Sequence, residues 1–70
     1  MAIVVNKKTM DLYKYNGKNS FTNLRTNVTG IVSDEAASKT FVINLEATQL
    51  IGEFPILEEL ICKLDLKMEK

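Results

Sequence analysis

Residues 40–68 decide the fold class, because the spacing of hydrophobic residues changes within TFVINLEATQLIGEFPILEELICKLDLKM. Over residues 40–45 the apolar positions alternate, with Phe41, Ile43 and Leu45 on one side, which predicts a strand. From residue 47 onward the apolar positions recur at helical spacing, at Leu50, Phe54, Leu57, Ile61, Leu64 and Met68. A strand followed by an amphipathic helix predicts an α+β chain.

Gly52 and Pro55 interrupt the helical stripe. Proline lacks a backbone N–H and clashes inside a helix, but it fits the first turn of one. We therefore predict a short helical segment over residues 47–52 and a main helix from Pro55 to about residue 67. Glu59 and Lys63 are spaced to form a favourable pair on this helix.

The N-terminal half predicts further strands. Residues 2–5 are continuously apolar and residues 10–15 alternate loosely, so both read as short strands, and Asn16-Gly17 between residues 15 and 21 is the strongest turn signal. A third strand is expected over residues 21–32. Its inward positions would be Leu24, Thr26, Val28 and Val32, with a bend at Gly30.

Residues 33–39 form a polar loop that could hold a helical turn capped by Ser33 or Asp34. Because this loop is short, the strands over residues 21–32 and 40–45 are expected to pair antiparallel. The sequence thus predicts one small α+β domain over residues 1–70. It would consist of an antiparallel sheet of three to four strands with a C-terminal helix packed on one face.

The composition argues against an enzyme. The chain has no histidine and one cysteine, Cys62, so it lacks the commonest general base and metal ligand and cannot form an internal disulfide. The acidic pairs Asp34-Glu35 and Glu58-Glu59 are adjacent in sequence, so the two carboxylates of each pair point in different directions. We predict no catalytic residues, no metal site and no cofactor.

The compartment is predicted from what the sequence lacks. The apolar N-terminal residues are followed by Lys7 and Lys8, whereas a secretory signal places its charges first. The longest charge-free stretch, residues 26–33, is too short to span a membrane. We expect a cytoplasmic protein with no membrane partner.

The leading functional prediction is a non-catalytic protein-interaction module that self-associates. A predicted helix over residues 55–67 would leave Ile56, Cys62 and Leu66 off the buried stripe, and exposed apolar groups of this kind mark an interface. The expected partners are a second copy of the chain and an unidentified protein. Small inhibitors and adaptors encoded by phages or mobile elements fit this description.

The alternative prediction is a domain that binds single-stranded nucleic acid. Residues 1–32 carry five basic residues and one acidic residue, a net of +4, whereas residues 33–70 carry four basic and eight acidic residues, a net of −4. Aromatic side chains among basic ones hold single strands by stacking and phosphate contacts. The predicted binding residues are Tyr13, Lys14, Tyr15, Lys18 and Arg25. The competing interpretation is that both tyrosines lie in the core or in a dimer interface.

Overall fold

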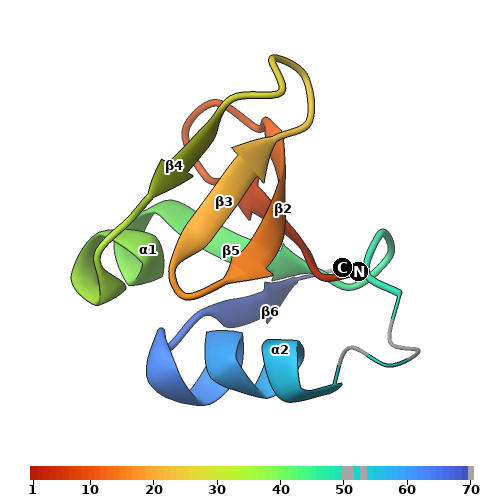
Figure 1. Cartoon of the computed structure of the whole chain (residues 1–70), viewed down its shortest axis with the longest axis vertical. Helices are drawn as coiled ribbons and strands as arrows, with labels where there is room; N and C mark the ends of the chain where they lie inside the picture. Colours follow the sequence, from red (N-terminus) through yellow and green to blue (C-terminus); the bar gives the residue numbers. More distant parts are fainter. Residues whose placement is uncertain (50–51, 53, 70) are drawn as a thin grey trace.

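The fold is α+β, as the sequence predicts, in a computed structural model that describes residues 1–49, 52 and 54–69, without the side chains of residues 54 and 69. Figure 1 shows a curled sheet with one short helix beside it and a helical segment below it. The elements in chain order are β1 Ile3–Asn6, β2 Leu12–Gly17, β3 Ser20–Asn23, β4 Thr29–Ile31, α1 Asp34–Thr40, β5 Phe41–Asn44, α2 Phe54–Glu58, the π-helix η1 Glu59–Lys63, and β6 Lys67–Glu69.

The sheet has six strands in the order β4-β3-β2-β1-β5-β6. The neighbouring strands are antiparallel except β5 and β6, which are parallel. The prediction of three to four strands is therefore too low in number. The prediction that all strands are antiparallel is wrong for β5 and β6. The strand β5 pairs with β1 rather than with the strands immediately before it, which curls the chain around a common core.

Strand alternation gives the sheet an inner and an outer face. The inner face carries Val4, Tyr15, Phe21, Phe41 and Ile43, all of which belong to the hydrophobic core. The helical residues Ala37, Leu57 and Leu60, and Leu64 just after the π-helix, pack against it. The outer face carries Ile3, Val5 and Val42, which are also buried.

The hairpin between β2 and β3 turns two residues later than predicted. Gly17 pairs with Ser20, so the two turn residues are Lys18 and Asn19, with φ of 53° and 64°. Positive φ at both positions is typical of a type I′ turn. Gly17, at φ 91°, lies where the register between the strands shifts. The Asn-Gly signal thus marks a bulge next to the turn.

The single strand predicted over residues 21–32 is wrong, because this segment folds into the hairpin β3–β4. Asn23 causes the reversal: its Oδ1 accepts hydrogen bonds from the backbone N–H groups of Arg25 (2.7 Å) and Thr26 (3.1 Å). Such side-chain turns compete with extended structure. Leu24 and Val28, predicted to point inward, are 46% and 65% exposed.

The helix α1 confirms the predicted cap. Ser33 is its N-cap and accepts a hydrogen bond from the backbone N–H of Ala36 at 3.2 Å. The helix predicted over residues 47–52 is not formed at residues 47–49, which lie in a turn and an irregular segment. Residues 50 and 51 of that prediction lie outside the described residues.

The predicted main helix is shorter than expected and changes type. It begins at Phe54, becomes the π-helix η1 at Glu59 and ends at Lys63. The backbone N–H of Leu64 bonds to the carbonyl of Glu59, five residues back, at 3.1 Å. This wider turn moves Ile61 to the surface, 36% exposed, whereas Leu60 and Leu64 are buried. Among the described residues, no helix is long and apolar enough to cross a membrane.

Candidate functional site

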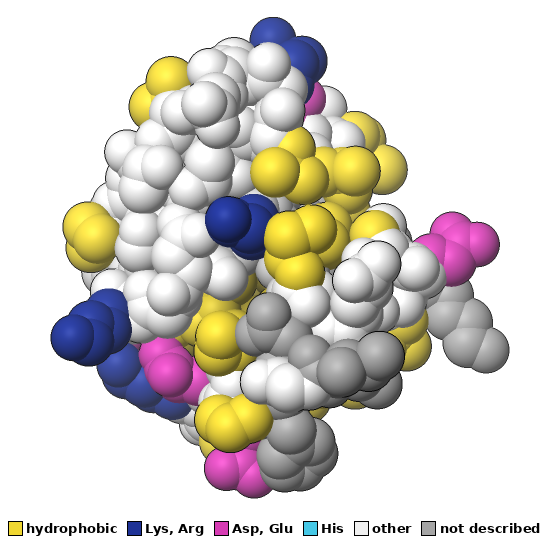
Figure 2. All heavy atoms as spheres, turned by 45° about the vertical axis from the view of Figure 1, so that its right-hand side comes forward, with side chains coloured by type: hydrophobic (Ala, Val, Ile, Leu, Met, Phe, Trp, Pro, Cys, Tyr) yellow, Lys and Arg dark blue, Asp and Glu magenta, His cyan; other side chains and the backbone are white. Residues whose placement is uncertain are grey.

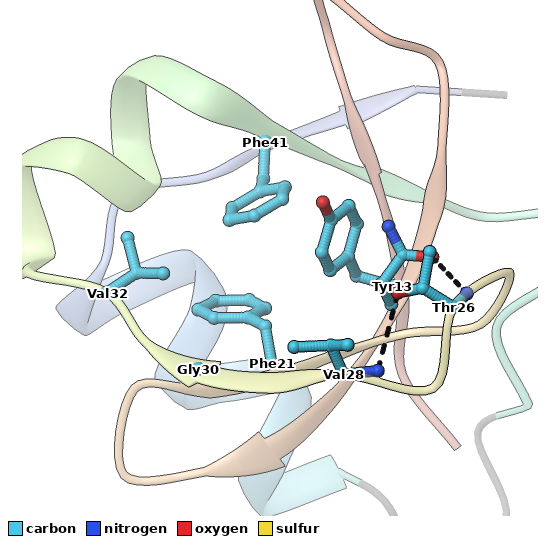
Figure 3. A pocket seen from close by; sticks show the side chains of 8 residues that line it. Tyr13, Phe21, Thr26, Val28, Gly30, Val32 and Phe41 are labelled. Atoms are coloured by element: carbon cyan, nitrogen blue, oxygen red, sulfur yellow. Dashed lines mark hydrogen bonds between the residues drawn. The ribbon is translucent and has the colours of Figure 1, made fainter.

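A cavity of about 420 Å³ opens on the inner face of the sheet. Its walls are mainly apolar and come from β2, β3, β5 and the β3–β4 hairpin. The lining residues are Tyr13, Phe21, Asn23, Thr26, Val28, Gly30, Val32 and Phe41. Figure 3 shows the rings of Tyr13, Phe21 and Phe41 close to one another, with Val28 and Val32 projecting from the segment that carries β4.

The rings of Tyr13, Phe21 and Phe41 form an aromatic wall of the cavity, and contacts among these rings hold it in place. Phe21 stacks on Phe41 with ring centroids 4.6 Å apart, and Tyr13 meets Phe41 edge-on at 5.0 Å. Tyr15 packs on Phe21 from the core side at 4.9 Å. Phe21 and Phe41 are almost fully buried, so the wall is held in place before any ligand arrives.

The part of the cavity lined by Val28 and Gly30 is more open. Val28 is 65% exposed, and Gly30 contributes no side chain. A Cβ atom built at Gly30 would meet no other atom within 4 Å, so glycine leaves space there. An apolar group that entered between Val28 and the aromatic wall would therefore leave water at little cost in packing rearrangement.

The polar groups of the cavity serve mainly to shape it. Asn23 is buried and uses its Oδ1 for the turn described above, while its Nδ2 donates to Asp11 at 3.2 Å. Arg25 grips the same carboxylate with Nε at 3.3 Å and with its terminal nitrogen at 3.0 Å. The hydrogen bonds from Arg25 and then from Asn23 lower the pKa of Asp11 below its ordinary value. This network anchors the β3–β4 loop, and hence Val28, to the start of β2.

Beside the cavity, β4 forms one edge of the sheet. All three of its residues are exposed, and Ile31, at 75%, is the most exposed large hydrophobic residue among those whose side chains the structure describes. No charged residue lies between Thr26 and Ser33. The other edge, β6, begins with the exposed Lys67. Lysine is one of the residues by which proteins keep an edge from pairing, so β4 is the less protected edge.

A separate apolar group lies on the outer face, where Leu12 and Leu24 meet through a backbone hydrogen bond of 2.9 Å from the N–H of Leu24 to the carbonyl of Leu12. They are 39% and 46% exposed. Figure 2 shows hydrophobic side chains gathered in the right half of the face it presents, with basic side chains near them.

The structure does not bring the predicted interface residues together. Cys62 is exposed, as expected, but Ile56 is half-buried and packs against the core. Leu66 is 3% exposed and belongs to the core, so its predicted place on an exposed helix face is wrong. The reason is that the helix has ended before Leu66. Asp65, with φ of 58°, reverses the chain and directs it into β6.

The predicted nucleic-acid residues are also spread over the molecule. Tyr13 and Tyr15 share the inner face, but Tyr15 is 3% exposed and its ring is in the core. Lys14 lies between them on the strand and so points to the outer face. Lys18 is in the β2–β3 turn, and Arg25 is paired with Asp11. Nucleic-acid binding stays a prediction, and it would need a surface other than a platform of both tyrosines.

The cavity itself was missed from the sequence. Of its lining residues, only Tyr13 was predicted as a binding residue, for a different ligand. A signal was present: Phe21 and Phe41 are two of only three phenylalanines, each at the start of a predicted strand. Placing them face to face, however, requires knowing that β5 pairs with β1.

Comparisons with protein-family models, with curated proteins and with solved structures find no match to this chain. Within the part of the chain that the structure describes, no three metal-ligating side chains come together.

Proposed function

We propose that this protein is a non-catalytic protein-interaction module whose cavity takes an apolar side chain of a partner polypeptide. The observation that carries the proposal is a hollow of about 420 Å³ that is lined by the aromatic wall of Tyr13, Phe21 and Phe41 and by the exposed Val28. Binding pockets for small groups begin at about 300 Å³, and apolar anchors that fill such pockets dominate protein interfaces.

The lining chemistry supports binding rather than catalysis. None of the eight lining residues is a carboxylate, lysine, histidine or cysteine. The amide of Asn23 is committed to the turn and to Asp11. A ligand in the cavity would thus meet apolar contacts and the hydroxyl groups of Tyr13 and Thr26, but no lining histidine, carboxylate, lysine or cysteine that could activate those hydroxyls.

A peptide fits this combination of contacts. The hydroxyl of Tyr13 donates to no described residue, so it can bond to a backbone carbonyl of an incoming segment. The module would act by occupying a partner's surface, as an adaptor or inhibitor does. A cytoplasmic site of action and a phage or mobile-element origin belong to the same proposal, and they rest only on composition.

The direct test uses N-acetyl amino-acid amides as probes. N-acetyl-leucinamide and N-acetyl-phenylalaninamide should shift the methyl NMR signals of Val28 and Val32 in a saturable way, with N-acetyl-aspartamide as the negative control. A probe of this size should bind in the millimolar range, at about −0.3 kcal/mol per heavy atom. The same titration with an unrelated apolar small molecule, such as toluene, separates a peptide-selective pocket from a general apolar one.

Val28→Asp is the matching variant, because it places a charge at the rim and changes an exposed residue. It should weaken binding of the leucine amide by at least about fivefold. Ile61→Asp, which changes an exposed apolar residue on η1, should leave binding unchanged. If the Val28 and Val32 methyl signals do not move with either apolar amide, the proposal is wrong. Tighter binding of toluene than of both amides would reassign the pocket to a small apolar ligand.

A further inference from the structure

The exposed edge of β4 has free backbone groups at alternate residues. The carbonyl of Val28 accepts from the N–H of Asn23 at 2.9 Å, and the N–H of Val32 donates to the carbonyl of Asn19, also at 2.9 Å. Both residues therefore direct their bonds toward β3. Gly30, opposite Phe21 and midway between them, does the same by the alternation of an antiparallel ladder. Thr29 and Ile31 must then direct their N–H and C=O groups away from the sheet.

This arrangement is complementary to itself. We propose that two copies of this chain pair antiparallel through β4, about a twofold axis at Gly30, to join their sheets into one. With Gly30 opposite Gly30 of the second copy, Thr29 of each copy faces Ile31 of the other. These are the residues whose backbone groups point outward, and such a pair exchanges both of its hydrogen bonds.

The side chains favour the same pairing. On the outer face, the exposed Ile31 would lie across from Thr29 of the second copy, and on the inner face Val28 would lie across from Val32. The two most exposed apolar groups of the hairpin, at 75% and 65%, would thereby be covered. The absence of charge from residues 26–33 means that no ionised side chain is forced against the partner strand.

Charge complementarity favours a second copy of the chain as the partner of the β4 edge. The β4 strand has Arg25 in the loop before it and Asp34 and Glu35 in the helix after it. Antiparallel pairing about Gly30 brings the basic end of one copy to the acidic end of the other. The side chains of Arg25 and Glu35 are 69% and 79% exposed, so both are in contact with solvent near the two ends of the strand. Each already has a partner in its own chain, so these charges orient the pairing more than they strengthen it.

The inference goes beyond the proposed pocket function, because the pairing uses the backbone of the β4 edge. Of the cavity lining it involves Val28, Gly30 and Val32 but none of the three aromatic rings. The paired strand is only three residues long, so the interface is small and the dimer is expected to be weak. A test that traps the pairing is therefore more decisive than a measurement of mass alone.

The decisive variant is Gly30→Cys in a Cys62→Ser background, which leaves one thiol per chain. Directly opposed residues that are not bonded to each other lie about 4.5 Å apart between Cα atoms. That separation lies within the range for a disulfide, about 4.4–6.8 Å. The glycine φ is not in the left-handed region, and the added Cβ meets nothing within 4 Å, so the variant should fold. Mild oxidation should convert most of the protein to a covalent dimer.

Thr29→Cys in the same background is the matched control. The two Thr29 residues would be offset by two strand positions, about 7 Å along the strand in addition to the spacing between strands, which is too far for a disulfide. It should remain monomeric on a non-reducing gel. Equal cross-linking of both variants, or none at Gly30→Cys when circular dichroism shows it folded, would overturn the proposed pairing.

Ile31→Lys provides a second test in the chain with no added cysteine. Sedimentation of the unmodified chain at millimolar concentration should show a monomer–dimer equilibrium, and Ile31→Lys should shift it at least about tenfold toward monomer, because lysine opposes edge pairing. Met10→Lys, which changes a residue in the β1–β2 loop that is 68% exposed, should leave it unchanged. A strictly monomeric unmodified chain, or a dimer insensitive to Ile31→Lys, would exclude a β4 interface whether or not the cavity binds its probes.

Discussion

The hydroxyl of Tyr15 on β2 donates a hydrogen bond to Oε1 of Glu59, the first residue of the π-helix, 44 residues further along the chain. The same carboxylate oxygen accepts from the backbone N–H of Lys18 at 3.2 Å. The hydroxyl of Tyr15 also accepts from the backbone N–H of Asn19 at 3.2 Å. One buried tyrosine thus joins the β2–β3 turn to the C-terminal helical segment.

Tyr15→Phe should therefore lower the free energy of unfolding by about 1–2 kcal/mol, because a hydrogen bond to a charged acceptor is lost and Asn19 loses an acceptor. In a domain of this size that corresponds to a fall in melting temperature of about 10 °C. Thermal unfolding followed by circular dichroism measures it. Tyr13→Phe is the control: its hydroxyl bonds to no described residue, so its effect should stay within about 0.5 kcal/mol. Equal effects of both variants would contradict this account.

Tyr15 should also make the fold sensitive to alkaline pH. Burial, and then its hydrogen bond to Glu59, raise the pKa of Tyr15 to about 12 from an ordinary value of 10.0. Between these values the unfolded chain has released the proton and the folded chain still holds it, so stability falls as pH rises through this window and is constant in this respect below it. In Tyr13→Phe, Tyr15 is the only tyrosine, and its absorbance at 295 nm can be followed directly. Titration with a midpoint near pH 10 in the folded protein would contradict the prediction.

The anchor of the β3–β4 loop should respond to acid. Arg25 and Asn23 lower the pKa of Asp11, so this carboxylate contributes stability above its unfolded pKa, and the contribution is lost as pH falls through the lower, folded pKa. Below about pH 4, the free energy of unfolding measured with urea should fall more steeply for the unmodified chain than for Asp11→Asn. Glu35→Gln, which changes an exposed ion pair within α1, is the control. If the free energy of unfolding depended on pH equally in the unmodified chain and in Asp11→Asn, the Asp11 carboxylate would not contribute to the acid sensitivity of the fold.

Local signals in the sequence predicted the elements better than their partners. The α+β class, the strand at residues 41–44 and the Ser33 cap follow from period and capping chemistry, which act within a few residues. The pairing of β5 with β1 does not, because it depends on how the whole chain encloses its core. The cavity depends on that pairing, since it brings Phe41 to Phe21.

Residues that the sequence pattern placed wrongly have local causes. A single turn-forming residue can end a strand or a helix although the hydrophobic pattern continues. Asn23 ends a strand whose apolar residues continue alternating, and Asp65 ends a helix whose stripe continues to Met68. Both are polar residues that favour turns, and Asp65 adopts a positive φ without being glycine. The π-helix then shifts the buried apolar stripe by one residue, and no residue type in η1 predicts a π-helix.

The reversal at Asp65 leads to a prediction that separates Leu66 from Cys62. Leu66→Ala should lower the free energy of unfolding by about 2–4 kcal/mol, since it leaves a cavity in the core. Cys62→Ala, at an exposed position four residues earlier, should change it by no more than about 0.5 kcal/mol. Urea unfolding measures both. If instead Leu66→Ala were neutral, residue 66 would lie on the surface and the helix would extend past Lys63.

Asn19 links the β2–β3 turn by side-chain hydrogen bonds to the segment after β4 and to η1. Its Nδ2 donates to the carbonyl of Val32 at 2.9 Å and to Asp34 at 2.6 Å, and its Oδ1 accepts from Lys63 at 3.4 Å. Its φ of 64° is in the left-handed region, which glycine and asparagine adopt more readily than alanine. Asn19→Gly therefore removes only the side-chain bonds and should cost about 1–2 kcal/mol, whereas Asn19→Ala adds about 1 kcal/mol of backbone strain. Urea unfolding of the two variants gives the difference directly. Because Val32 and Asp34 flank the end of β4, hydrogen exchange at Val32 should accelerate in both variants. Equal stability of Asn19→Gly and the unmodified chain would mean that backbone pairing alone holds the β4 edge in place.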